Sequence, residues 1–167
     1  MAAGATYEPI ATSTLGSAAS SVTFSSISGS YTDLVLVGNG LVTVSNSGVT
    51  ITFNNTGGGT YSNTRLIGDG STAAGQRSTN QDSGILNYNG NWTTANNDSN
   101  FIVHINSYSS TFNYKTYLSR ANRYDSGTDL IMGLWRSTSA ITTITLAPSV
   151  NQFAAGATFT LYGITAA

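Results

Sequence analysis

Apolar side chains recur at every second position along most of this chain, which is the spacing of half-buried β-strands. Val49, Ile51 and Phe53 alternate with threonines, and a later segment of residues 101–105 repeats the pattern. Residues 31–38 (YTDLVLVG) are almost continuously apolar, which predicts a strand covered on both faces. β-Branched and aromatic residues fill further candidate strands at 21–27, 114–120, 129–135, 140–146 and 158–164.

Clusters of Gly, Asn, Ser and Asp separate these segments, as in residues 54–59 (NNTGGG), and they predict turns. No window of about 11–18 residues carries a capped helical stripe of apolar positions. We therefore expect an all-β protein, a single antiparallel jelly-roll β-sandwich of about eight strands that spans residues 1–167. The polar tract at 70–84 (GSTAAGQRSTNQDSG) is predicted to form one long loop.

The alternation also predicts the core and the roles of the two ends. Residues 156–167 contain no charged side chain, and we expect their strand to be paired inside a sheet, because an unpaired apolar edge invites aggregation. Residues 1–10 include Pro9, which restricts a strand to a sheet edge, so this segment is a candidate docking or swapped strand. The predicted core consists of Val22, Phe24, Leu34, Leu36, Val49, Ile51, Phe53, Phe101, Val103, Ile105, Leu118, Ile144, Leu146, Phe159 and Leu161.

The composition favours a protein that works within an assembly. Charged residues make up only 8% of the chain, against roughly 25% in ordinary domains, and the net charge is −1. Such a surface does little to repel copies of itself. The chain has no cysteine, which excludes disulfides and thiolate metal sites. The N-terminal residues lack the features of a signal peptide, and no apolar run is long enough for a membrane span, so we expect no membrane partner.

The sequence contains no arrangement of residues that predicts an active site. His104 is the single histidine, on the strand face opposite Phe101, and no second histidine or cysteine could join it around a metal. Most acidic residues lie in turn sequences, where aspartate bonds the local backbone. Asp125 and Asp129 could share a cation, but their loop lacks the ligand pattern of a calcium site, and a turn is favoured. We expect no catalytic residue, no cofactor and no metal.

One candidate contact surface centres on Trp92 in the polar segment NGNWTTANN. An aromatic ring flanked by amides is a common means of stacking a sugar in β-sandwich modules, and Tyr88 and Asn91 would lie beside it. The alternative is that the tryptophan folds back over the edge of the sandwich.

A second candidate surface is the basic segment that contains Lys115, Arg120 and Arg123 with tyrosines between them. Arginine and tyrosine are enriched at protein interfaces, so we expect contacts with a partner protein or with another subunit. Nucleic-acid surfaces use similar residues, but a net charge of −1 supplies little attraction for phosphate, and we expect no nucleic-acid partner.

The ordered strand sequences resemble a β-sandwich domain of virion proteins from tailed bacteriophages, notably those that infect cyanobacteria. The resemblance covers the chain from about Thr6 to Ile164 and is carried by TYEPIATSTLGSAASSVTFSSI, YTDLVLVGNG, ITFNN, YSNTRLIGDG, YKTYLSR, GLWRSTSAITTITL and FAAGATFTLYGI, in that order. It implies a jelly-roll fold, a non-enzymatic role and symmetric homo-oligomers, often trimers. Members of the family are capsid cement or decoration proteins and terminal modules of tail fibres.

The sequence shows neither coiled-coil heptads nor a collagen-like repeat, which a fibre shaft would require. We therefore expect a cement protein at the surface of the virion head, which contacts the major capsid protein and other copies of itself, as a homotrimer. The alternative is a tail-fibre or receptor-binding module whose partner is a host surface glycan.

Overall fold

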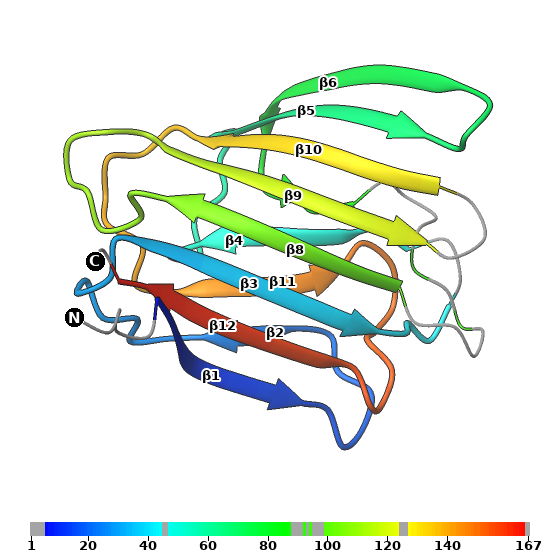
Figure 1. Ribbon diagram of the computed structural model, residues 1–167, viewed down its shortest axis with the longest axis horizontal. Helices are drawn as coiled ribbons and strands as arrows, with labels where there is room; N and C mark the ends of the chain where they lie inside the picture. The colour runs from blue at the N-terminus through cyan, green and yellow to red at the C-terminus, as the bar shows by residue number, and fades with distance from the viewer. Residues whose placement is uncertain are drawn as a thin grey trace.

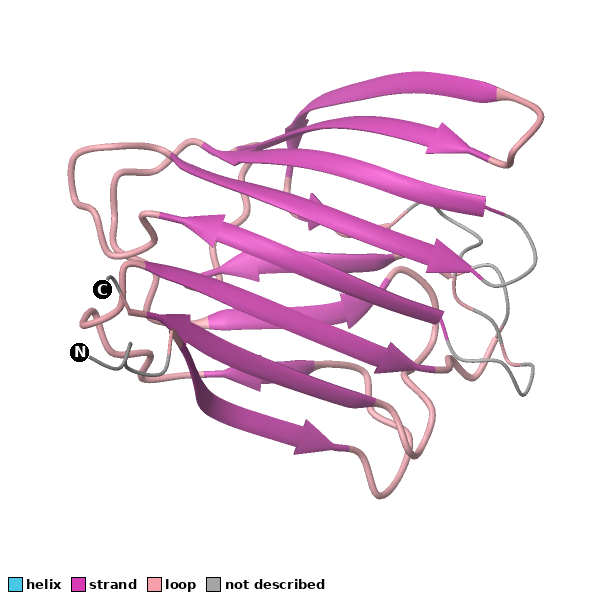
Figure 2. Ribbon diagram, viewed as in Figure 1, coloured by secondary structure: helices cyan, strands magenta, loops and turns pink. Residues whose placement is uncertain are grey.

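The computed structural model describes residues 6–44, 47–87, 92, 94, 99–123 and 127–165. Within these residues the chain forms two antiparallel β-sheets and no helix, as Figures 1 and 2 show. The predicted all-β, antiparallel character is therefore confirmed. The single histidine, His104, lies on an exposed strand position between buried Val103 and Ile105, as the alternation predicted.

The two sheets differ in size, and the smaller lies behind the larger in Figure 1. The larger sheet has eight strands, in the order β1 (Tyr7–Thr14), β12 (Thr158–Ile164), β3 (Asp33–Gly40), β8 (Ser99–Asn106), β9 (Lys115–Arg123), β10 (Gly127–Trp135), β5 (Tyr61–Gly68) and β6 (Ala73–Gln81). The smaller sheet has four strands, in the order β2 (Val22–Phe24), β11 (Ile144–Pro148), β4 (Val49–Phe53) and β7 (Gly84–Ile85).

The described residues contain twelve strands, so the expected number of about eight is wrong. The expected long loop at 70–84 is wrong as well, because most of it is β6 and the start of β7. Eight of the nine residues of β6 are exposed, so the strand carries none of the apolar alternation on which the sequence analysis relied. It is a strand because it pairs with β5 from Gly68↔Ala73 to Tyr61↔Gln81.

Asp69 organises the turn that joins β5 to β6. Its carboxylate accepts hydrogen bonds from the backbone amides of Ser71 (2.9 Å) and Thr72 (2.6 Å) and from both of their hydroxyl groups. These bonds stabilise the ionised carboxylate and hold the pKa of Asp69 well below its usual range. Gly70 adopts φ +88°, a conformation that glycine enters without steric cost.

The core lies between the two sheets and combines their inward-facing side chains. Fourteen of the fifteen predicted core residues are buried, the exception being Leu118. The terminal strand is paired on both sides, with β1 and β3, and its Phe159 and Leu161 are fully buried, as predicted. The core contains two groups of packed aromatic rings: Phe53 with Tyr61, Tyr117 and Trp135, and Trp92 with Phe101, Phe153 and Phe159.

Leu118 was placed on the wrong face of its strand. It exposes 43% of its surface, whereas the neighbouring Tyr117 exposes 3% and occupies the core. A shift of one residue exchanges the two faces of a strand, and the segment YKTYLSR has apolar atoms on both. Tyr117 turns inward because its hydroxyl reaches acceptors inside the protein, Asn63 Oδ1 at 2.8 Å and the Ile85 carbonyl at 3.0 Å.

The start of the chain lies at an edge of the larger sheet. β1 pairs with β12 of the same chain, with a bulge between Pro9 and Ala11, and no strand of the described part lies on its other side. This position suits Pro9, which has no amide hydrogen for a second partner. Residues 7–10 of the candidate docking segment are therefore strand residues, and residues 1–5 lie outside the described part of the chain.

Strand glycines in the larger sheet make room for aromatic rings. Gly133 lies directly opposite Tyr117, and a Cβ atom added to it would come within 1.9 Å of the tyrosine ring. Gly38 stands in the same relation to its cross-strand neighbour Phe101, at 2.3 Å. In both places the missing side chain lets a ring lie flat over the neighbouring strand and fill the core.

We predict that Gly133→Val destabilises the fold by about 1–3 kcal/mol, because the added side chain must displace the Tyr117 ring from a closely packed core. Denaturation in urea measures this loss. The control is Gly75→Ala in β6, where an added Cβ would meet its nearest neighbour, in Leu66, at an ordinary 3.7 Å. Equal unfolding free energies for the two variants would contradict the packing assigned to Gly133.

Candidate functional site

The outer face of the larger sheet, which points away from the smaller one, carries four large apolar side chains in adjacent positions. Met132 lies directly opposite Leu118, and Leu130 lies directly opposite Leu66. Their exposed fractions are 43% for Met132 and Leu118, 36% for Leu130 and 50% for Leu66. We call these four residues the outer patch. Apolar groups gathered on one face of a folded chain mark an interaction site more often than the same residues scattered singly do.

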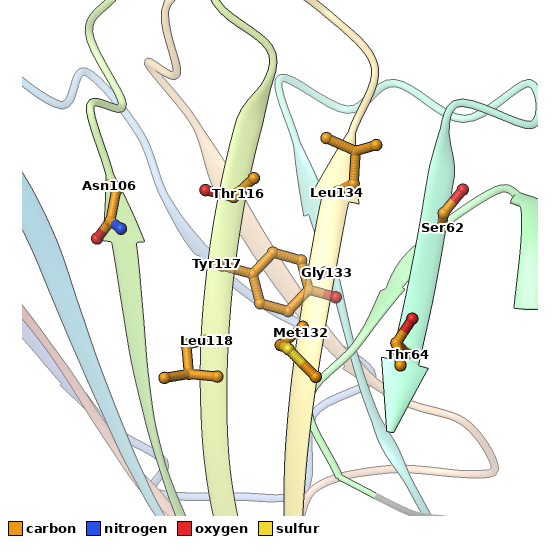
Figure 3. A pocket seen from close by; sticks show the side chains of 9 residues that line it. All are labelled: Ser62, Thr64, Asn106, Thr116, Tyr117, Leu118, Met132, Gly133 and Leu134. Atoms are coloured by element: carbon orange, nitrogen blue, oxygen red, sulfur yellow. The ribbon is translucent and has the colours of Figure 1, made fainter. Parts of the chain in front are cut away.

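Two shallow hollows flank the outer patch. The first, of about 510 Å³, has Leu118, Met132 and Leu134 along its middle. Its rim is polar and uncharged, and Figure 3 shows the side chains of Ser62, Thr64, Asn106 and Thr116 around it. The second hollow, of about 320 Å³, lies over the other end of β5, β9 and β10, between Leu66, Leu130 and Arg120. An apolar centre with a polar rim is the usual anatomy of a protein–protein contact.

The basic segment of the sequence analysis contributes one residue to this surface. Arg120 is exposed on the outer face, directly opposite Leu130. Lys115 lies on the inner side of the same strand and is 1% exposed, with its ammonium group donating to the carbonyls of Asn113 (2.7 Å) and Thr138 (3.2 Å). Burial lowers the pKa of Lys115, and its contacts are structural. Arg123 ends β9 opposite Gly127, and its side chain lies outside the described part.

Trp92 is a core residue. It is fully buried, and its ring stacks on Phe159 with centroids 6.1 Å apart and an angle of 11° between planes. Its backbone is fixed by two hydrogen bonds with Ser47, which form an isolated β-bridge. A sugar cannot reach this ring, so Trp92 does not supply the expected stacking surface. Tyr88 and Asn91, its expected neighbours at that site, lie outside the described residues.

Asp69 bonds the backbone of its own turn, as its sequence context predicted, whereas Asp33, the first residue of β3, and Asp82 bond backbone amides that are distant in the sequence. Asp33 accepts the Ser107 amide at 2.7 Å, Asp69 organises the β5–β6 turn, and Asp82 accepts two amides of the glycine cluster at 2.9 and 3.0 Å. Asp129 is buried, and Asp125 lies outside the described residues. Over the described ranges, no three His, Cys, Asp or Glu side chains come close enough together to hold a metal ion.

A third exposed feature lies in the loop between β8 and β9. Phe112 exposes 88% of its surface, and Tyr114 exposes 55%. The loop has a defined shape, because Ser110 Oγ accepts the amides of Phe112 (3.2 Å) and Asn113 (3.4 Å). Tyr108 anchors it, since its ring is fully buried and its backbone carbonyl accepts the Ile141 amide.

Comparisons with known proteins assign no family to this chain. No protein-family model matches the sequence, and no curated protein matches it. No helix in the described part of the chain is long and apolar enough to cross a membrane. The function is therefore inferred from the outer patch and from the resemblance of the strand sequences.

We predict that Trp92→Ala lowers the unfolding free energy by about 3–5 kcal/mol, because it leaves a cavity among three aromatic rings. Urea denaturation followed by fluorescence or circular dichroism measures the loss. Phe112→Ala is the matched control, because it removes an aromatic ring that is exposed, and its effect should stay within about 0.5 kcal/mol. A Trp92 variant as stable as the wild type would contradict the core role.

A second prediction concerns alkaline pH. Burial raises the pKa of Tyr117 above its ordinary value of about 10, so the unfolded chain loses this proton before the folded chain does. Folding stability should therefore fall as the pH rises above about 10, and Tyr117→Phe should make that fall shallower. Urea midpoints at several pH values from about 8 to 11 measure the effect. Tyr114→Phe, on an exposed ring, is the control, and an identical slope in all three proteins would refute the assignment.

Proposed function

We propose that this protein is a non-enzymatic structural protein of a tailed-phage virion, a cement protein that docks on the capsid through the outer face of its larger sheet. The observation that carries the proposal is the outer patch, four apolar side chains in register on three strands with hollows on both sides. A monomer in water gains nothing from exposing these residues. A protein partner that covers them would remove their apolar surface from water.

The composition supports docking against a large surface. Arg120 is the charged side chain that borders the patch on β9, and the rim of the larger hollow is uncharged. Few charges therefore lose their hydration when this face is covered, which keeps the cost of desolvation low. A cement protein acts by mass action, because each bound copy stabilises the assembled shell relative to the free subunits.

The resemblance of the strand sequences supplies the class of partner, the major capsid protein, and a jelly-roll arrangement belongs to the same proposal. Consecutive strands that change sheets support that arrangement: β2 lies in the smaller sheet, β3 in the larger and β4 in the smaller again. The proposal also includes self-association into a closed homo-oligomer, to which the low charge of the chain is suited.

We predict that Leu118→Glu weakens binding to undecorated heads of the parent phage at least tenfold, because covering this face would strip a carboxylate of its hydration. Fold and thermal stability should be retained, since Leu118 is outside the core. Co-sedimentation of protein with heads measures the binding. Thr23→Glu, on an exposed position of the smaller sheet, is the control and should bind as the wild type does. Equal binding of the two variants would rule out the outer patch as the docking surface.

A receptor-binding module of the tail is the second candidate, and the exposed Phe112 and Tyr114 favour it. Two aromatic rings on a shaped, uncharged polar loop could stack on a neutral sugar. A glycan array distinguishes the candidates. A cement protein leaves the array blank and binds heads, whereas binding to a glycan that is lost in Phe112→Ala would favour the receptor module.

A further inference from the structure

The two sheets of the described residues have four edge strands, and three of them are protected against pairing with another chain. β2 and β7 have three and two residues, which are too few to template a new strand. β1 has Pro9 and a bulge, and each of them interrupts the row of free backbone groups. β6 differs from all three. It has nine residues and no proline, its one irregularity is confined to the end between Ser78 and Gln81, and among the described strands it pairs only with β5.

The surroundings of β6 leave space for another strand. The smaller sheet ends at β7, so the β5–β6 hairpin extends beyond it, at the top of Figure 1. A hollow of about 220 Å³ lies under the hairpin, between Asn63, Arg65 and Ile85. From Gly68↔Ala73 to Asn63↔Ser78 the pairing of β6 with β5 is uninterrupted, so residues 73–78 form a regular edge.

We propose that β6 pairs in an antiparallel manner with β6 of a second copy of this chain, about a twofold axis at Gln76. In this register the regular segment 74–78 pairs with its own copy, and Arg77 of each chain lies opposite Gly75 of the other. A twofold axis at Arg77 would instead place the Arg77 side chains of the two copies directly opposite each other, and their like charges would repel. Centring it on Gly75 would require pairing by Thr72, which the Asp69 carboxylate holds in the turn.

The side chains of β6 fit this register. Gly75 lies opposite Leu66 of β5 on the outer face, and a Cβ atom added to Gly75 would meet only Leu66 at 3.7 Å and the Arg65 carbonyl at 4.0 Å. The long Arg77 side chain of the second copy would cross Gly75 and cover part of Leu66, which is half exposed in the single chain. The other paired positions carry small or polar side chains, Ala74 against Ser78, which allow the two backbones to approach.

The pairing has a consequence for docking, and this step rests on the proposed function. A twofold axis perpendicular to the sheet leaves both outer patches on the same side of the joined sheet. A dimer would therefore present two docking surfaces to one shell, and two linked contacts bind far more tightly than one. The symmetry gives a dimer in place of the trimer that the family resemblance implies.

The first experiment measures self-association by analytical ultracentrifugation of the purified protein from about 1 to 500 µM, because one pair of strands buries little area and should associate weakly. Gly75→Lys places a second positive charge opposite Arg77 at two symmetric positions and should weaken dimerisation about fivefold, whereas Gly75→Glu should strengthen it by a similar factor. The matched controls are Gly16→Lys and Gly16→Glu, at an open loop position where an added side chain meets nothing.

If Gly75→Lys weakens dimerisation and Gly75→Glu strengthens it, the proposed register is supported. Equal effects of the two substitutions on dimerisation overturn it. A wild-type protein that is a monomer or a trimer throughout the concentration range overturns the dimer. These measurements use no capsid, so they stand whether or not the protein binds heads, and loss of head binding in Leu118→Glu tests the docking proposal separately.

The second experiment uses the absence of cysteine from the chain. Directly opposed residues of antiparallel strands have Cα atoms about 4.5–5.5 Å apart, which a disulfide can bridge. Gln76→Cys should therefore form a covalent dimer on mild oxidation. Ser78→Cys should not, because its two copies would lie about 13 Å apart along the strands. Cross-linking of the Ser78 variant in preference to the Gln76 variant would refute the proposed axis.

Discussion

The unequal width of the two sheets is the constraint on which the rest of the structure depends. A sheet of four strands cannot cover one face of a sheet of eight, so the core forms only where the two overlap. Along β5 the change is visible on the inward face of one strand, because Tyr61 and Asn63 are buried at its start and Ile67 is only partly buried near its end. β6 lies beyond the overlap and has almost no buried side chain. Its order therefore depends on backbone pairing and on the Asp69 turn, since little apolar burial can contribute there.

The strands in which apolar and polar residues alternate were predictable from the sequence, and the strand without that alternation was missed. Val49, Ile51 and Phe53 are buried at alternate positions because β4 has the core on one side only. β6 has no such period, because neither of its faces is covered, and a strand without a buried face has the composition of a loop. The predicted burial of Leu118 was wrong for a related reason. In β9 the inward position is set by the acceptors that the Tyr117 hydroxyl reaches and by the room above Gly133 on the neighbouring strand, and the local sequence pattern contains neither.

The candidate site was less predictable than the fold, because it depends on which strands become neighbours. Leu66, Leu118, Leu130 and Met132 are distributed over three strands that are not all consecutive, and cross-strand pairing brings them together. One local signal pointed to them: the segment DLIMGLW is apolar at consecutive positions, which indicates a strand with apolar residues on both faces. For Trp92 the prediction was wrong in the opposite direction, because the side chain was expected at the surface and is fully buried. Its polar neighbours in the sequence suggested exposure, yet an isolated bridge to Ser47 places its ring among phenylalanines.

An apolar strand with two apolar faces constrains the function more strongly than any single side chain does. In β10, Ile131 and Trp135 face the core, while Leu130 and Met132 face outward on the same strand. The inward residues are explained by folding, but the outward residues are only partly buried, so they contribute less to the stability of the single chain and raise its risk of aggregation. The low charge of the surface does not offset that risk. The combination is physically consistent when a second protein surface covers the outer face, because the same burial then stabilises the complex.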